Sequence, residues 1–249
     1  MEREYDRDFY SERHRKTLYS ARKILSIVVD ALPEVDSAAD FGCGVGTWLS
    51  VLREQGVRDI LGMDGPWVEG SLLEIPEEDF RRIDFEEFSG IDGRYDLAIS
   101  LEVAEHLCEE RAASFIGALT DASDFVLFSA AIPFQAGRFH VNEQWPDYWA
   151  GLFAERGYVP LDFIRGMIWN DEDIPFWYRQ NTLLFAQEQR LDQVDPPKSE
   201  LSRDGCPISL VHPNIYLDKA ARMVSVRGTW RLFRQAMGKW FRKKLRLGL

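Results

Sequence analysis

The stretch Asp40-Phe-Gly-Cys-Gly-Val-Gly46 decides the fold of this chain. An apolar segment typical of a strand, residues 37–41, leads into it, and residues 47–55 after it have the pattern of a helix that Gly56 closes. Glycines in such a turn let a ligand approach the backbone closely, and the N-terminus of the following helix offers unpaired N–H groups. The Gly-x-Gly-x-Gly spacing differs from the Gly-x-Gly-x-x-Gly of a dinucleotide-binding turn. We therefore expect a nucleotide-like ligand other than a dinucleotide.

Strands and helices alternate along the chain around this turn. Residues 10–32 carry apolar residues at roughly helical spacing and stop before Pro33, which predicts an amphipathic N-terminal helix. Further strands are predicted at residues 58–64, 81–84, 95–101, 125–132, 159–164 and 182–186, and further helices at 104–119 and 145–156.

The pattern of these elements predicts the fold class. Near-continuous apolar strands indicate a sheet that is covered on both faces, and the last two strands are expected to form an antiparallel pair. We predict an α/β fold with a doubly wound, Rossmann-like, seven-stranded, mostly parallel sheet and helices on both faces. Ligands of such folds bind at the carboxyl ends of the strands, near the topological switch point.

The composition is typical of a soluble globular protein. Hydrophobic residues make up 45% and charged residues 29% of the 249 residues, and no apolar run is long enough to cross a bilayer. The charged N-terminus lacks an apolar signal core, and there are only three widely spaced cysteines. These features predict a cytoplasmic protein with one main domain.

Charge is unevenly distributed along the chain. The net charge is −11, yet residues 219–249 contain ten Lys or Arg and no acidic residue, which leaves −21 on the first 218 residues. An acidic body repels nucleic acid phosphates at long range, so we do not expect a nucleic acid partner unless the basic segment delivers it.

The glycine turn and the residues after it resemble the class I S-adenosylmethionine-dependent methyltransferase family over roughly residues 20–187. The first motif of this family is an acidic residue followed by Gly-x-Gly-x-Gly, as in Asp40 to Gly46. Asp64 closes the second strand eighteen residues later, where the family hydrogen-bonds the ribose, and Asp84 with Phe85 stands where it reads adenine. The resemblance implies S-adenosylmethionine as methyl donor. The donor-binding residues that it implies are Asp40, Gly42, Gly44, Gly46, Asp64, Gly65, Asp84, Phe85, Ser100, Leu101 and Glu102.

The domain organisation follows from this resemblance and from the change in composition near residue 190. We expect a methyltransferase domain at residues 1–190, of which 1–36 form an N-terminal helical cap, a linker or strap at 191–225, and a basic amphipathic tail at 226–249. A basic amphipathic segment can contact the inner face of an anionic membrane, bind an acidic partner, or dock on the acidic body of its own chain.

The residues that follow the fourth and fifth strands are candidates for catalysis. Methyl transfer is an in-line displacement, and an alcohol acceptor also needs a general base or a metal that acidifies its hydroxyl. Glu102-x-x-Glu105-His106 is predicted to open a helix after the fourth strand, with both carboxylates on one helical face, and His140 follows the fifth strand. Both loops should therefore border one crevice, with His140, Glu105 and His106 as candidate catalytic residues.

This pairing resembles two metal-using branches of the family, the small-RNA 2′-O-methyltransferases and the ubiquinone-pathway O-methyltransferases. The resemblance implies that Glu102, Glu105, His106 and His140 hold Mg²⁺ or a similar divalent cation. Two alternatives need no metal. His140 is then a general base or purely structural, while Glu102 contacts the donor and Glu105 and His106 cap and pack the helix.

The acceptor is suggested by a second resemblance. Residues 128–149, together with 181–185, resemble bacterial methyltransferases of cell-surface polysaccharide and glycan biosynthesis, which implies a sugar hydroxyl as acceptor. In that setting Asn142, Glu143, Trp145 and Tyr148 are candidates for lining the acceptor pocket. The alternatives are a small-molecule N- or O-methyltransferase outside glycan metabolism and a non-catalytic cofactor-binding scaffold.

Overall fold

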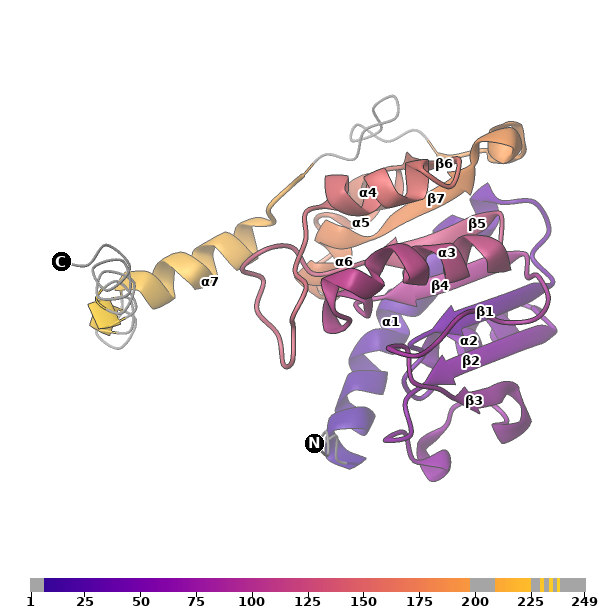
Figure 1. Ribbon diagram of the computed structural model, residues 1–249, viewed down its shortest axis with the longest axis horizontal. Coiled ribbons are helices and arrows are strands. Elements are labelled where there is room, and N and C mark those ends of the chain that lie inside the picture. Colours follow the sequence, from indigo (N-terminus) through magenta and orange to yellow (C-terminus); the bar gives the residue numbers. More distant parts are fainter. Residues whose placement is uncertain (1–6, 198–208, 225–228, 231–232, 235–236, 238–249) are drawn as a thin grey trace. The chain divides into compact units, whose positions relative to one another are not determined.

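The computed structural model describes residues 7–197, 209–224, 229–230, 233–234 and 237 (Figure 1). The chain divides into two compact units, residues 1–209 and residues 210–249. The first unit contains a seven-stranded sheet with the order β3-β2-β1-β4-β5-β7-β6. Its strands are β1 (Ser37–Phe41), β2 (Asp59–Asp64), β3 (Phe80–Arg82), β4 (Leu97–Leu101), β5 (Phe125–Ser129), β6 (Tyr158–Leu161) and β7 (Leu183–Gln187).

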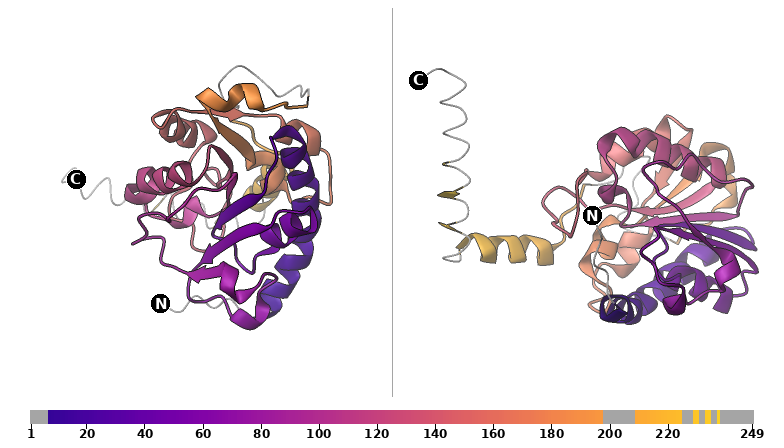
Figure 2. Two further views of the ribbon diagram at one scale, coloured as in Figure 1. Left: turned by 90° about the vertical axis from the view of Figure 1, so that its right-hand side faces the viewer. Right: turned by 60° about the horizontal axis from the view of Figure 1, so that its bottom comes forward.

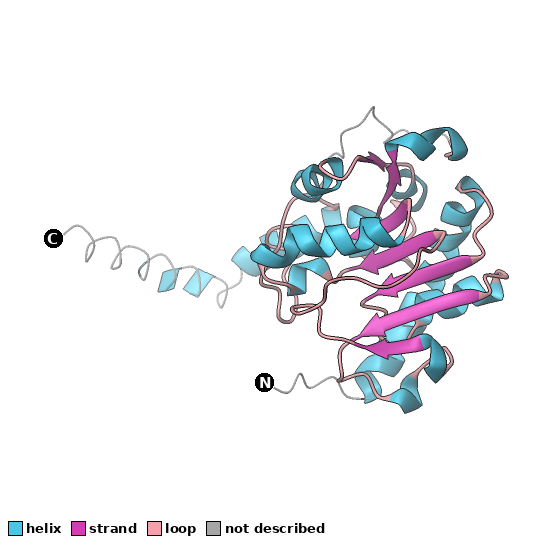
Figure 3. Ribbon diagram, turned by 45° about the vertical axis from the view of Figure 1, so that its right-hand side comes forward, coloured by secondary structure: helices cyan, strands magenta, loops and turns pink. Residues whose placement is uncertain are grey.

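The strand pairing confirms the mostly parallel, doubly wound sheet. Strands β1 to β5 are mutually parallel, and β7 runs antiparallel to both β5 and β6 (Figure 3). The chain runs from β1 outward to β3 and then returns to place β4 on the other side of β1. The topological switch point therefore lies between β1 and β4, where Asp40 is in register with Ile99.

Helices cover both faces of this sheet, as predicted (Figure 2). The helices α1 (Arg7–Ala31), α2 (Thr47–Glu54) and α5 (Ile164–Ile168) pack on one face, and α3 (Ala112–Ala122) and α4 (Pro146–Ala154) on the other. The alternation of side chains along each strand supplies both cores. In β4, for example, Leu97 and Ile99 join the first core and Ala98 joins the second.

One predicted helix is wrong in the region that matters most for function. Residues 104–119 do not form one helix: two 3-10 turns, Ala104–His106 and Glu109–Arg111, precede α3. The carbonyl of Glu105 accepts hydrogen bonds from the amides of Val141 and Asn142 instead of from its own segment. The side chain of Glu86 accepts a hydrogen bond from the amide of Cys108. Contacts between distant segments thus replace the helical hydrogen bonds, and Glu102 and Glu105 do not share a helical face.

Other boundaries also differ from the predictions. Strand β5 ends at Ser129 instead of residue 132, and α5 and α6 (Phe176–Asn181) are short helices in a stretch without a clear helical pattern. In the second unit, α7 (Pro213–Val224) lies within residues 191–225, which were expected to form a linker or strap. Most of the predicted tail at 226–249 lies outside the described residues. Among the described residues, no helix combines the length and apolarity that crossing a bilayer requires.

Candidate functional site

A cavity opens at the switch point, where β1, β2 and β4 end. Eight of the eleven predicted donor-binding residues line it, and His106 lies on the same wall. These eight are Asp40, Gly42, Gly44, Asp64, Asp84, Phe85, Leu101 and Glu102. The other three do not line the cavity but lie behind it: Ser100 is fully buried and donates its hydroxyl to the carbonyl of Phe41, while Gly46 packs against Ile75 and Gly65 against Trp67.

Two glycines of the turn, Gly42 and Gly44, have different surroundings. A Cβ on Gly42 would lie 2.3 Å from Cγ2 of Val103, so the close packing of the turn against the residues after β4 requires glycine. Gly44 has a φ of +58°, in the left-handed region, and no atom lies within 4 Å of the place where its Cβ would be. The backbone at Gly44 is therefore open to the cavity and accessible to a ligand.

The carboxylate of Asp64 joins the ends of β1 and β2. It accepts hydrogen bonds from the amides of Gly44, at 2.7 Å, and Gly65, at 2.6 Å. These bonds orient the carboxylate at the cavity wall. A carboxylate accepts up to about four hydrogen bonds, so acceptor sites remain for ribose hydroxyls.

Asp40 is a buried carboxyl group, only 2% exposed. Its Oδ2 atom has no hydrogen-bond partner among the described residues, although the residue lines the cavity. Burial, and secondarily the nearby charge of Asp64, raise the pKa of Asp40 well above its usual value. Such a group fits a cationic or hydrogen-bond-donating ligand, which would supply the missing partner.

Several cavity residues were not predicted. Trp48 of α2 and Tyr178 of α6 line the cavity with their rings in an edge contact, with centroids 5.4 Å apart, and Thr17 of α1 and Trp67 after β2 also line it. Trp48 follows the glycine turn directly, so its position in the sequence was a usable signal. Tyr178 comes from a helix more than a hundred residues away, and as an aromatic residue it was a candidate for stacking on a sugar ring, not for lining this cavity.

Glu102 is held by a buried polar network. Its carboxylate accepts hydrogen bonds from Gln135 Nε2, at 2.9 Å, and Asn181 Nδ2, at 3.0 Å. Burial raises the pKa of Glu102, and the hydrogen bonds from Asn181, Ser129 and Gln135 oppose that rise. Its φ of +57° is strained for a non-glycine residue. Neither Gln135 nor Asn181 was predicted to belong to the site.

The structure brings together three of the four predicted metal ligands. Ligand atoms of Glu105, His106 and His140 all lie within 4.8 Å of one another. The rings of the two histidines are perpendicular, with centroids 4.9 Å apart, and Nε2 of His140 lies 3.8 Å from Oε1 of Glu105. Glu102 is outside this cluster, and its carboxylate accepts hydrogen bonds from the two amides.

Glu143 holds the other side of the His140 ring. His140 Nδ1 donates to Glu143 Oε1 at 2.9 Å, and the same carboxylate accepts hydrogen bonds from the amides of Phe134 and Ala136. A carboxylate on Nδ1 orients the imidazole and fixes its tautomer, while Nε2 faces Glu105. From the sequence, Glu143 was a candidate only for lining the acceptor pocket, since its contact with His140 depends on how the loop turns back.

The strand order, the glycine turn and the acidic residues at the strand ends define a Rossmann-like fold of the class I methyltransferase type. A family model described as "Methyltransferase domain" matches residues 11–158. The chain therefore belongs to this methyltransferase family and is a class I S-adenosylmethionine-dependent methyltransferase.

Solved structures agree with this fold. Magnesium protoporphyrin IX methyltransferase from Synechocystis PCC 6803, crystallised with bound SAH, is 20% identical, covers 70% of this chain and 83% of its own, and has a TM-score of 0.51. A SAM dependent methyltransferase from Archaeoglobus fulgidus is 17% identical, covers 73% of this chain and 100% of its own, and has a TM-score of 0.53. No curated protein matches the sequence. At these identities the similarity concerns the fold.

Proposed function

We propose that this enzyme transfers the methyl group of S-adenosylmethionine to a hydroxyl of a sugar or glycan intermediate. The observation that carries the proposal is the pair of carboxylates around one imidazole: Glu143 at Nδ1 of His140 and Glu105 facing Nε2. An alcohol loses its proton with difficulty at neutral pH, so a poised base beside the donor cavity favours an oxygen acceptor. The sugar assignment rests on the resemblance of residues 128–149 and 181–185 to glycan methyltransferases.

The cavity fits the methyl donor by its chemistry. The unpartnered Oδ2 of Asp40 suits the donor's cationic end, the open backbone at Gly44 suits its middle, and the Asp64 carboxylate suits ribose hydroxyls. Phe85 and Asp84 line the wall assigned to adenine, where Phe85 is buried and Asp84 is exposed. Trp48 and Tyr178 add aromatic faces, which attract a sulfonium as they attract other cations.

In the proposed reaction His140 acts as general base. The bound donor supplies an electrophilic methyl group on a sulfonium, which leaves as a neutral thioether when the new C–O bond forms. His140 Nε2 takes the hydroxyl proton, and the carboxylates of Glu143 and Glu105 stabilise the imidazolium that results. Burial of Glu105 strengthens that stabilisation because few water molecules screen it.

A divalent cation is a second candidate for activating the hydroxyl, because three ligand atoms lie within 4.8 Å of one another. The residues that would hold it are Glu105, His106 and His140, with Glu143 orienting His140 from behind. Bound there, the cation would lower the pKa of a coordinated hydroxyl. Two imidazoles and one carboxylate suit Zn²⁺, Mn²⁺ or Fe²⁺ better than Mg²⁺, which prefers oxygen ligands.

The acceptor assignment is tested by incubating the full chain with radiolabelled S-adenosylmethionine and a panel of nucleotide sugars, free glycans and non-sugar phenols and amines. We expect label transfer to at least one sugar-containing acceptor in an alkali-stable ether linkage. Transfer only to phenols or amines would exclude the glycan role in favour of other small molecules. Donor binding without transfer to any acceptor would favour a non-catalytic scaffold.

Metal removal separates the two activation modes. With His140 as the base, we expect transfer by exhaustively chelated enzyme to continue at the rate of the untreated enzyme. The measurement is the transfer rate after dialysis against chelator, with metal content checked by mass spectrometry. A loss of about tenfold or more, restored by Mn²⁺ or Zn²⁺ better than by Mg²⁺, would instead assign Glu105, His106 and His140 as metal ligands.

A further inference from the structure

Exposed apolar side chains are concentrated in the β5–α4 loop, which we define as residues 130–145. Six large apolar side chains are exposed within the described residues 17–197, and four of them lie in this loop. They are Phe134 (82% exposed), Val141 (69%), Trp145 (40%) and Phe139 (37%). The other two, Tyr19 and Met167, lie on separate helices. Such a concentration on a monomer surface marks an interaction site.

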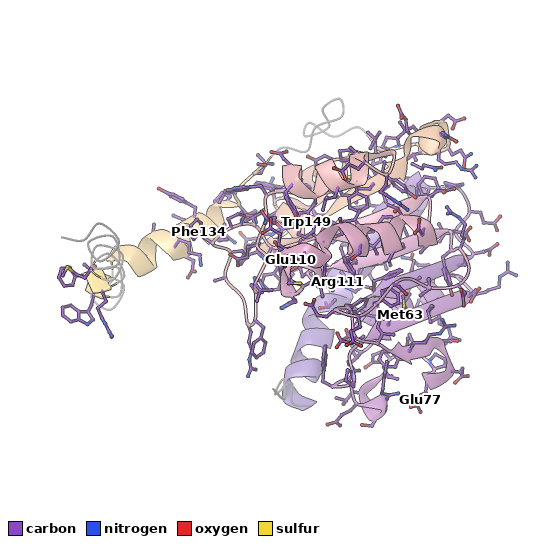
Figure 4. The ribbon with its side chains drawn as sticks, viewed as in Figure 1. Met63, Glu77, Glu110, Arg111, Phe134 and Trp149 are labelled. Carbon is purple, nitrogen blue, oxygen red and sulfur yellow. The ribbon has the colours of Figure 1, made fainter. Side chains whose placement is uncertain are left out.

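The loop extends beyond the carboxyl ends of the strands and is nevertheless held by several hydrogen bonds. It projects between β5 and α4, and Phe134 lies at the margin of the body (Figures 1 and 4). The carboxylate of Glu143 accepts hydrogen bonds from the amides of Phe134 and Ala136, and the amide of Gln144 donates one to the carbonyl of Ala131. These contacts fix the loop in a defined shape that keeps its apolar side chains in solvent.

The backbone of this loop carries strain. Phe134, Ala136 and Phe139 have φ values of 69°, 63° and 65°, in the left-handed region that non-glycine residues avoid. Such a conformation persists only where the surrounding structure holds it, and strain of this kind clusters at functional sites. Exposed apolar groups on a strained but well-bonded loop therefore point to a function that requires their exposure.

The charge of the loop differs from that of the surrounding body. Residues 130–145 contain one acidic residue, Glu143, and one basic residue, Arg138, although the first 218 residues carry a net charge of −21. The Glu143 carboxylate is bonded to His140 and to the amides of Phe134 and Ala136, whereas Arg138 is exposed and its guanidinium lies over the ring of Phe139, 5.2 Å from the centroid. An exposed aromatic surface with a cation at its margin matches the interface of a bilayer that contains anionic lipids, where rings and aliphatic groups insert and cations meet head groups.

We propose that the β5–α4 loop docks on the surface of an anionic lipid bilayer, with Phe134 and Val141 inserted among the lipids. His140 lies in the same loop, so docking presents the catalytic imidazole to a hydroxyl displayed at that surface. The docking itself does not depend on the acceptor; only the link to catalysis rests on the proposed function. Residues 210–249 independently carry the same chemistry, with ten basic residues, one acidic residue, and exposed Trp230 and Phe233.

The test measures binding of the full chain to vesicles of phosphatidylcholine and phosphatidylglycerol by co-sedimentation. The double variant Phe134→Ser/Val141→Ser should lower the partition coefficient about tenfold or more, because two inserted apolar side chains are lost. Met167→Ser removes an exposed apolar side chain on α5 and should bind like the unmodified chain. At high salt the difference between the two variants should persist, since salt screens the basic segment and not apolar insertion.

Equal binding by the two variants, with both of them folded by circular dichroism, would overturn the proposal. So would sedimentation-velocity data in which the double variant abolishes self-association while vesicle binding is unchanged, because the loop would then be a protein interface. The vesicle experiment involves no methyl transfer. A failure of the acceptor assignment and a failure of the docking proposal are therefore separately observable.

Discussion

Replacing His140 with alanine is expected to lower kcat by about 10²–10⁴-fold, the usual contribution of a general base. Binding of S-adenosylmethionine should be unchanged, because His140 does not line the donor cavity. The measurements are the initial rate of methyl transfer and the donor dissociation constant by calorimetry. A kcat close to that of the unmodified enzyme would show that His140 is structural.

Glu143→Gln is the matched variant for this experiment. The amide oxygen can still accept hydrogen bonds from Ala136 and His140, but the amide nitrogen that replaces Oε2 cannot accept from Phe134, and the charge that stabilises the imidazolium is removed. A positioning carboxylate behind a functional histidine contributes about 10–100-fold, so kcat should fall by that range while KM changes little. Circular dichroism and thermal unfolding like those of the unmodified enzyme would show that the variant is folded, so that a loss of kcat reflects the charge. If Glu143 only holds the loop, Glu143→Gln would instead have nearly unmodified kcat.

Asp40→Asn should weaken donor binding by about 10–100-fold, the range expected when a charged hydrogen-bond partner of a cationic ligand is removed. In the free enzyme the same change should stabilise the fold near neutral pH. Burial raises the pKa of Asp40 in the folded state above that of an unfolded aspartate, which is near 4. The protonated Asp40 therefore makes a contribution to stability that is fully present below about pH 4. That contribution is lost as the pH rises through the raised pKa. Asparagine stays neutral, so thermal unfolding without donor should show a growing advantage of the variant as the pH rises.

Donor binding supplies the second readout for Asp40. A cationic donor favours the ionised carboxylate, so binding should release a proton at pH values below the raised pKa, and affinity should rise with pH. Calorimetry in two buffers of different ionisation enthalpy measures this proton release. Asp84→Asn serves as the control, since Asp84 lines the same cavity but is exposed. Proton release that persists in Asp40→Asn would assign it to another group.

The acceptor side of the site shows why sequence patterns failed in one region. Residues 104–119 have a helical composition, but their hydrogen bonds go to distant segments. The carbonyl of Glu105 accepts from the amides of Val141 and Asn142, and the side chain of Glu86 accepts from the amide of Cys108. Helix propensity differs by only a fraction of a kcal/mol per residue among these residue types. A few hydrogen bonds from distant segments therefore outweigh it, and no local pattern records them.

The donor side was predictable because its parts are close along the chain or related by a simple rule. Gly42 and Gly44 belong to one turn, and Asp64 ends the strand that pairs with β1. Parallel strands end at one edge of a sheet, so spacing alone brings these residues together. The same rule correctly predicted that the segments after β4 and β5 would meet, which places His106 near His140.

The Asp40–Gly46 turn, the alternating elements and the seven-stranded sheet thus follow from the sequence, since each depends on neighbours within a few residues or on strand order. Only the tertiary structure decided that Glu102 is held by Gln135 and Asn181 and that Glu143 supports His140. It also decided that Phe134 and Val141 remain exposed, which their apolar character alone would not predict. These features depend on side chains from separate segments competing for the same polar atoms and the same buried volume, and that competition is resolved only when the chain has folded.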